Sequence, residues 1–214
     1  MLASSNTPPP PCRTGDAKAT FKLQWAVSTQ STPRPALLKS LAPRSASMAR
    51  RRNAILDQAR KIIGQQGFDA LTLRDLAKAA RVTVPTIYNL VGNKQALLLI
   101  LLDDLVQRLE VRLTPEHYPD PLAMAEAVIV ESAQVFQADE DFSRAALLVA
   151  EHIERQLTDE AETTMQGISQ RAMQLPINAC LAAGDAGLLR GAIAPEELGQ
   201  QIYRGYRTAW RDWA

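Results

Sequence analysis

The sequence predicts an all-α protein with two domains, and three observations predict it. Apolar residues recur at spacings of three and four along most of the chain after residue 48, which is the period of one helix face. Capping residues or first-turn prolines precede several of these runs, as at Asp120-Pro121 and Pro195. No segment of useful length alternates apolar and polar residues as a half-buried strand does. We therefore expect a small three-helix N-terminal domain at 48–95 and a larger helical domain at 96–214.

Residues 1–47 differ in composition from everything that follows. Pro8–Pro11 are four consecutive prolines, further prolines follow, and serine and threonine are abundant. Such a segment cannot bury a core, so we expect a disordered leader. It has no continuous apolar run of signal-peptide length. It resembles an organelle transit peptide loosely, but we favour a second interpretation, in which translation starts at Met48 and the leader is not part of the native protein.

The first predicted helix follows this leader, and its apolar residues form one stripe. It ends at Gly64-Gln65-Gln66-Gly67, because two glycines so close together disfavour a continued helix. The stripe consists of Ile55, Leu56, Ala59, Ile62 and Ile63.

Two short helices come next, in the stretch from Thr72 to Lys94. Thr72 is followed three residues later by Asp75, the order of a capping box, and the helix ends near Ala80. Thr83 is the expected N-cap of the second short helix, and Pro85 is tolerated in its first turn. The three residues between them form a turn. This layout is that of a helix-turn-helix, whose second helix enters the major groove of DNA.

The three helices resemble the DNA-binding domain of the TetR family of bacterial regulators. The resemblance covers Arg50 to about Leu102, and the remaining half is similar only in length and helical character. One residue departs from the family, which has glycine in the turn where this chain has Arg81. If Arg81 adopts a left-handed conformation, its side chain costs on the order of 1 kcal/mol, and it is a candidate phosphate contact. The matching residues are Ile55, Ala59, Gly67, Phe68, Thr72, Asp75, Leu76, Ala77, Ala80, Val82, Thr83, Thr86, Ile87, Tyr88, Lys94 and Leu97.

The resemblance implies roles for individual residues, and these roles suit their chemistry. Side chains with hydroxyl or cationic groups would bind phosphates and set the register: Thr72, Arg74, Thr83, Tyr88 and Lys94. Pro85, Thr86 and Asn89 would meet base edges, with Asn89 suited to adenine and the other two to a thymine methyl. Arg50 begins a basic run that is equally an arm for DNA and a solubilising start. Each of two residues has an alternative interpretation when it is considered alone. Tyr88 could pack in the core, and Lys94 could be a solvated residue at the start of a helix.

The net charge of +1 conceals a strong asymmetry along the chain. Residues 1–47 carry a net charge of +5, residues 48–97 carry +6, and residues 98–214 carry −10. A basic module joined to an acidic one is typical of a protein that presents one end to a polyanion. The charge pattern therefore favours nucleic-acid binding by the same segment that carries the helix-turn-helix.

The C-terminal domain is predicted to consist of five helices. Its apolar run at 96–102 is too short to span a membrane, so we expect a buried helix that connects the two domains. We expect Pro176 to kink or break the fourth of these helices. The helices are expected from Asn93 to about Leu113, from Asp120 to about Gln137, from about Asp139 to Gln156, from Thr158 to a turn at Gly184–Gly187, and from Pro195 to the chain end.

In the resembling family the second domain binds a small ligand and forms a two-fold dimer on a palindromic operator. The resemblance therefore implies a repressor that a small-molecule effector releases from DNA, in the bacterial cytoplasm. Residues of the helical domain that could line the ligand pocket, or simply belong to the core, are Met124, Val128, Leu148, Glu151, His152 and Met165. The aromatic last helix suits an interface or intramolecular packing. The family usually has one more helix, so the C-terminus would be truncated, with an exposed apolar surface on the last helix.

Signs of catalysis are weak in this sequence. Cys12 and Cys180 are too few and too far apart for a zinc site, and no phosphate-binding glycine loop, HExxH or GxSxG motif occurs. We expect no enzyme activity, no metal and no cofactor. The alternative to a DNA-binding regulator is a helical protein-interaction adaptor, which would show no affinity for DNA even at low salt.

Overall fold

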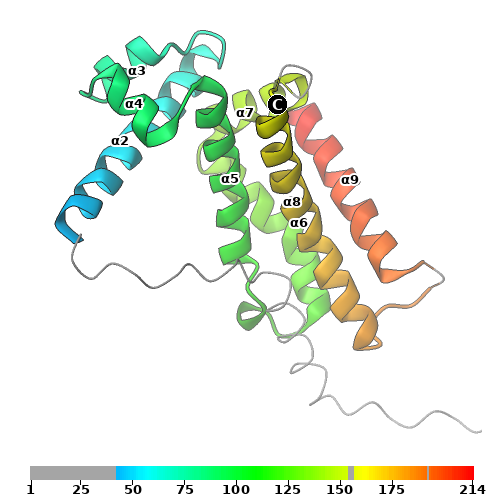
Figure 1. Ribbon diagram of the computed structural model, residues 1–214. Coiled ribbons are helices and arrows are strands. Elements are labelled where there is room, and N and C mark those ends of the chain that lie inside the picture. The colour runs from blue at the N-terminus through cyan, green and yellow to red at the C-terminus, as the bar shows by residue number, and fades with distance from the viewer. Residues whose placement is uncertain (1–41, 154–156, 192) are drawn as a thin grey trace, which may run out of the picture.

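The computed structural model describes residues 42–153, 157–191 and 193–214, and these residues confirm the all-α fold (Figure 1). The expected disorder of residues 1–41 lies outside them. No strand occurs within the described residues. The helices are α2 (Ala42–Gln66), α3 (Leu73–Ala79), α4 (Val84–Val91), α5 (Lys94–Arg112), the 3-10 turn η1 (Pro115–His117), α6 (Pro121–Gln137), α7 (Glu140–Ile153), α8 (Asp159–Asp185) and α9 (Pro195–Trp213).

Two helices differ from the sequence prediction, one in where it begins and one in its continuity. Helix α2 begins at Ala42, so the expectation of disorder up to residue 47 is wrong for residues 42–47. Pro43 stands in the first turn of α2, where an amide hydrogen has no intrahelical partner, and the alanines and arginines that follow favour a helix. Helix α8 also continues through Pro176 without a break.

Local capping explains why α3, α5 and α6 start where the sequence predicted, whereas Thr158, expected to cap α8, precedes that helix without a side-chain capping hydrogen bond. The hydroxyl oxygen of Thr72 accepts from the backbone N–H of Asp75 at 3.1 Å and donates to the Asp75 carboxylate at 2.6 Å. The side-chain oxygens of Asn93 and Asp120 accept from backbone amides of α5 and α6 at 2.8 and 2.9 Å. Gly92 ends α4 with a φ of 82°, a conformation that glycine adopts at no steric cost. The starts of α3, α5 and α6 are therefore fixed by residues close in sequence.

Helices α2, α3 and α4 form the small domain, and α5 leads from it into the bundle of α5, α6, α8 and α9 (Figure 1). The hydrophobic core runs without interruption from Ile55 in α2 to Ala182 in α8. Helix α5 contributes a row of buried leucines to this core, among them Leu97, Leu101 and Leu105. Helix α5 is buried along most of its length and so belongs to one core with the small domain and the bundle.

Helix α7 supports the small domain from the other side. A Cβ atom on Gly64 of α2 would lie 3.0 Å from the Cβ of Asp141 and 3.0 Å from the backbone nitrogen of Phe142. Phe142 itself is fully buried. Gly64 therefore permits a backbone approach between α2 and α7 that a larger residue would disturb.

Helix α9 turns its aromatic side inward. The rings of Trp210 and Phe136 meet edge to face with centroids 4.8 Å apart, and the Arg144 guanidinium lies 4.4 Å above the Trp213 ring. Of the described residues of α9, no large apolar side chain is exposed, so the expected apolar surface is absent from this helix. Trp210 and Trp213 therefore pack against α6 and α7 within the chain.

Candidate nucleic-acid interface and effector cavity

Helix α4 has one buried face and one exposed face. Ile87 and Val91 pack into the core of the small domain, whereas Pro85, Tyr88 and Asn89 are exposed. The hydroxyl of Thr83 caps the helix by accepting from the Thr86 amide at 3.4 Å, and the two hydroxyl oxygens lie 2.8 Å apart. The amphipathic pattern of eight residues therefore presents polar and small groups outward on a short, firmly anchored helix.

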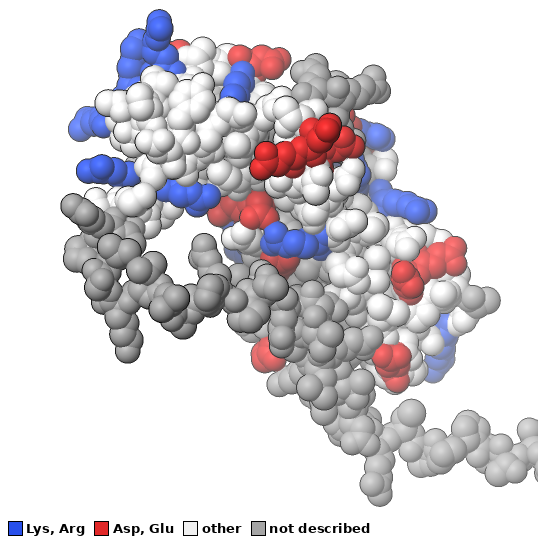
Figure 2. All heavy atoms as spheres, in the orientation of Figure 1, with Lys and Arg blue, Asp and Glu red and all other residues white. Residues whose placement is uncertain are grey.

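The candidate phosphate contacts lie around this helix. Thr72 and Arg74, at the start of α3, are exposed, and so is Arg50 on α2. Tyr88 has 55% of its surface exposed, so the alternative of core packing does not describe it. Figure 2 shows blue lysine and arginine side chains around the small domain, and several red acidic side chains over the bundle. Blue side chains also lie over the bundle in this view, so the basic side chains gather around the small domain without being confined to it.

Lys94 has an intramolecular role. Its Nζ donates to the backbone oxygen of Asp69 at 3.0 Å and lies 4.5 Å above the centroid of the Phe68 ring. The side chain thereby joins the start of α5 to the loop after α2. An ammonium group has three donors, so the remaining ones can still meet a phosphate. Removing Lys94 would test packing and DNA contact together.

Arg81, in the turn between α3 and α4, has a φ of 54°. It is the only described residue other than glycine with a positive φ. The left-handed conformation inferred from the family's glycine is therefore present, and the arginine carries its strain. The side chain is exposed beside α4.

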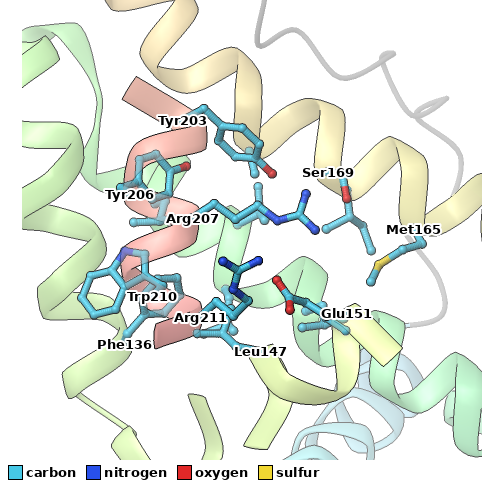
Figure 3. Close-up of a pocket in the computed structure, with 17 residues that line it drawn as sticks. Phe136, Leu147, Glu151, Met165, Ser169, Tyr203, Tyr206, Arg207, Trp210 and Arg211 are labelled. Atoms are coloured by element: carbon cyan, nitrogen blue, oxygen red, sulfur yellow. The ribbon is translucent and has the colours of Figure 1, made fainter. Parts of the chain in front are cut away.

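A cavity of about 130 Å³ lies within the bundle, and every helix from α5 to α9 contributes to it (Figure 3). Its walls are mainly apolar. Apolar lining residues include Leu102, Leu105, Val106, Leu109, Phe136, Leu147, Ala150, Met165, Ile168 and Ala172. Polar groups come from Glu151, Ser169, Tyr203, Tyr206, Arg207, Trp210 and Arg211. Burial raises the pKa of the Tyr206 phenol, so this hydroxyl remains protonated and can donate a hydrogen bond.

The structure separates the candidate pocket residues. Glu151 and Met165 line the cavity. Met124 and Val128 are buried in the core of α6 and do not line it, and Leu148 points outward with 41% of its surface exposed. The side chain of His152 lies outside the described residues.

The residues that sequence reasoning missed are the α5 leucines and the polar residues of α9. Apolar periodicity cannot distinguish a cavity wall from a filled core. The spacing of Tyr203, Tyr206, Arg207 and Trp210 in the last helix was a usable signal, because it places arginines beside an aromatic stripe.

Ion pairs join α5 to both of its neighbours. Arg171 of α8 donates to the two carboxylate oxygens of Glu110 at 2.9 and 2.6 Å and also pairs with Asp103. The hydrogen bonds to Glu110 contribute most to raising the pKa of Arg171. On the other side, Arg60 of α2 donates to Asp104 at 2.8 Å. Adjacent residues of α5 therefore connect the bundle and the small domain.

Two further classes of site can be checked against the structure. Within the described ranges, no three His, Cys, Asp or Glu side chains gather as a metal-binding group. In that same part of the chain, no helix is both long and apolar enough to cross a bilayer.

Comparison with known proteins gives matches to regulators. Residues 55–101 match the family model described as "Bacterial regulatory proteins, tetR family". The HTH-type transcriptional repressor ComR of Escherichia coli (strain K12) is 39% identical over 57 residues, which are 27% of this chain and 27% of ComR. This sequence match therefore spans about a quarter of that relative's length.

Two solved structures extend the similarity to the bundle. The fatty acid degradation regulator FadR from Bacillus halodurans superposes with a TM-score of 0.62 at 19% identity, covering 76% of this chain and 83% of that one. AibR in complex with isovaleryl coenzyme A and operator DNA gives 0.57 at 18% identity, covering 77% and 87%. At such identities the likeness is one of fold.

Proposed function

Since the chain has the helix-turn-helix domain and the fold of the TetR family of bacterial transcriptional regulators, we propose that it is a sequence-specific DNA-binding repressor. A small molecule that fills the bundle cavity would release it from a palindromic operator. The observation that carries this proposal is the exposed face of α4, where Pro85, Tyr88 and Asn89 project from a helix capped at both ends. We place this regulator in the bacterial cytoplasm, where its DNA lies.

The contacts divide by chemistry. The Asn89 amide can pair with both hydrogen-bonding groups of an adenine edge, and Pro85 or the Thr86 methyl can pack on a thymine methyl. The other candidates bind phosphates and set the position of α4, and they are Arg50, Thr72, Arg74, Thr83, Tyr88 and Lys94. A bidentate base contact contributes about 1–3 kcal/mol of discrimination, so Asn89 is the residue on which specificity depends most.

A homodimer would present two copies of α4 to successive turns of the major groove, about 34–36 Å apart, and would read a palindrome. AibR has been solved with operator DNA, which supports DNA binding by this fold. In our proposal the basic small domain faces the phosphates and the acidic bundle faces away from them.

Effector release follows from the connections of the cavity. Helices α5 and α7 both line it, and both contact the small domain. A ligand that prefers one arrangement of these helices would shift the population toward it and change the distance between the two copies of α4. Couplings of this kind are typically 1–3 kcal/mol, or about 5–150-fold in DNA affinity. The presence of isovaleryl coenzyme A on AibR supports a small-molecule effector here.

Selection of genomic fragments by the purified full-length chain tests the proposal. We expect a palindromic site, and we expect Asn89→Ala to weaken binding to it by about tenfold or more while affinity for a scrambled duplex changes little. Gln201→Ala is the matched control, because Gln201 is an exposed amide side chain on α9, in the bundle. An absence of DNA binding at low salt would instead favour the interaction adaptor.

A further inference from the structure

Two arginines of α9 line a mainly apolar cavity. Figure 3 shows the guanidinium groups of Arg207 and Arg211 reaching from α9 to the side where Glu151 and Ser169 lie. The described lining residues carry these two cations and a single carboxylate, that of Glu151. The surrounding segment 98–214 has a net charge of −10, so the two arginines at the cavity have a charge opposite in sign to that of their own domain.

These arginines are weakly engaged within the protein. Arg207 forms no ion pair with any described residue, and Arg211 pairs with its sequence neighbour Asp212 at 3.6 Å. Both side chains of that pair are more than half exposed, so the interaction holds Arg211 only loosely. Two guanidinium groups are therefore available to a molecule in the cavity.

One further donor beside the cavity lacks an acceptor within the described ranges, and a second lies on its wall. The indole nitrogen of Trp210 is buried and has no hydrogen-bond partner among the described residues. The phenol of Tyr206 lies one helical turn away on the same wall. The indole nitrogen is itself buried and does not open onto the cavity, so the donors that a ligand with acceptor oxygens would meet are the two arginines and the Tyr206 phenol.

We propose that the cavity binds a compact amphipathic carboxylate, with its carboxylate at Arg207 and Arg211 and an apolar body of about six carbons between α5 and α8. The body size follows from the cavity of about 130 Å³, because a cavity of roughly 150 Å³ holds one benzene molecule. Arginine suits the head group, since its planar fork matches a carboxylate. This inference rests on the proposed function only in assigning the cavity to the effector.

The test is isothermal titration of the full-length chain with hexanoate, 1-hexanol and hexylamine, which all have chains of six carbons and differ in head group. Hexanoate is expected to bind at least tenfold more tightly than either of the others. Affinity is expected to rise about fourfold per methylene from butanoate to hexanoate and to stop rising once the cavity is full. Tighter binding of hexylamine would assign the head-group site to Glu151 and overturn the proposal, as would equal binding of all three.

Variants of α9 distinguish direct binding of the carboxylate by Arg207 and Arg211 from the effect of the overall electrostatic field of the protein. The double variant Arg207→Ala, Arg211→Ala is expected to lose at least tenfold in hexanoate affinity and to keep its affinity for hexanol. Arg204→Ala is the matched control, because Arg204 is an exposed arginine of the same helix that does not line the cavity. Equal losses in the control and the double variant would overturn the assignment. Glu151→Gln removes the negative charge that repels a bound carboxylate, so it is expected to tighten hexanoate binding severalfold. This variant tests the same site without changing any side chain of α9.

DNA binding measured in the same samples keeps the two proposals apart. Hexanoate binding that leaves DNA affinity unchanged would support the ligand class and contradict its role as effector. DNA binding by a protein that does not bind hexanoate would overturn the ligand class alone. Hexanoate binding by a protein without DNA affinity would overturn the regulator and support the carboxylate site.

Discussion

Two glycines of α9 provide a matched test of how closely α9 packs on α8. A Cβ on Gly199 would lie 2.5 Å from the Cα of Ile177 and 2.8 Å from its backbone nitrogen, whereas a Cβ on Gly205 has no neighbour within 4 Å. Ordinary contacts of a Cβ begin near 3.4 Å, so Gly199→Ala requires α9 to move away from the α8 backbone by roughly 1 Å.

The two substitutions are expected to change the free energy of unfolding in opposite directions. Gly205→Ala should stabilise the protein by up to about 1 kcal/mol, because alanine favours a helix interior by that amount. Gly199→Ala gains the same propensity but incurs an overpacking cost of about 1–3 kcal/mol or more. Gly199→Ala should therefore be less stable than Gly205→Ala by about that cost. The moved helix also carries Tyr206, Arg207 and Trp210, so hexanoate affinity should fall in Gly199→Ala alone.

Urea unfolding followed by circular dichroism at equal protein concentration measures both variants against the parent chain. The midpoints and slopes give the difference in the free energy of unfolding. Equal stability of the two variants would refute the reasoning, because it would mean that α9 does not approach α8 as closely as Gly199 and Ile177 indicate.

Three further predictions concern the small domain. Arg81→Gly is expected to stabilise the chain by about 1 kcal/mol in thermal unfolding, because glycine adopts the φ of 54° without strain; an unchanged melting temperature would count against that strain. Gly64→Ala is expected to disturb the contact of α2 with Asp141 and Phe142 and so to change DNA affinity, measured against Gly205→Ala; a DNA affinity equal to that of the control would contradict a role for this contact. Thr72→Ala removes a cap, with an expected loss of about 1 kcal/mol. The Thr72 hydrogen bond is the largest cause that lowers the pKa of Asp75, so NMR titration of Thr72→Ala should show that pKa rising toward its usual value. A carboxyl group whose pKa is lower in the folded chain than in the unfolded chain stabilises the fold at pH values above its unfolded pKa. This contribution is lost as the pH falls through the folded pKa. An Asp75 pKa that is the same in Thr72→Ala and in the parent chain would refute the assignment.

The predictions that succeeded depend on residues close in sequence. Thr72, Asn93 and Asp120 each cap a helix through an atom three residues away, so the sequence alone indicated where α3, α5 and α6 begin. The left-handed Arg81 was predictable from the resemblance, since the turn is as local as the caps.

The cavity could not be predicted in the same way. Its wall residues are spread from Leu102 to Arg211 over five helices, and a leucine that borders empty space has the same periodicity as one in a filled core. Leu148 illustrates the limit: it belongs to an apolar run of α7 and is 41% exposed, whereas its neighbour Leu147 lines the cavity. The extension of α2 upstream of residue 48 was missed because proline and serine content outweighed the helix-forming alanines there.

Binding to random duplex DNA as a function of salt tests the central claim, that the small domain binds DNA. The four cationic phosphate candidates, Arg50, Arg74, Arg81 and Lys94, lead us to expect a plot of log affinity against log salt with a slope of about −3.6 per subunit. Arg74→Ala should make that slope shallower by about 1 without loss of fold, because Arg74 is exposed. A slope near zero, or no binding at the lowest salt concentration, would contradict the claim.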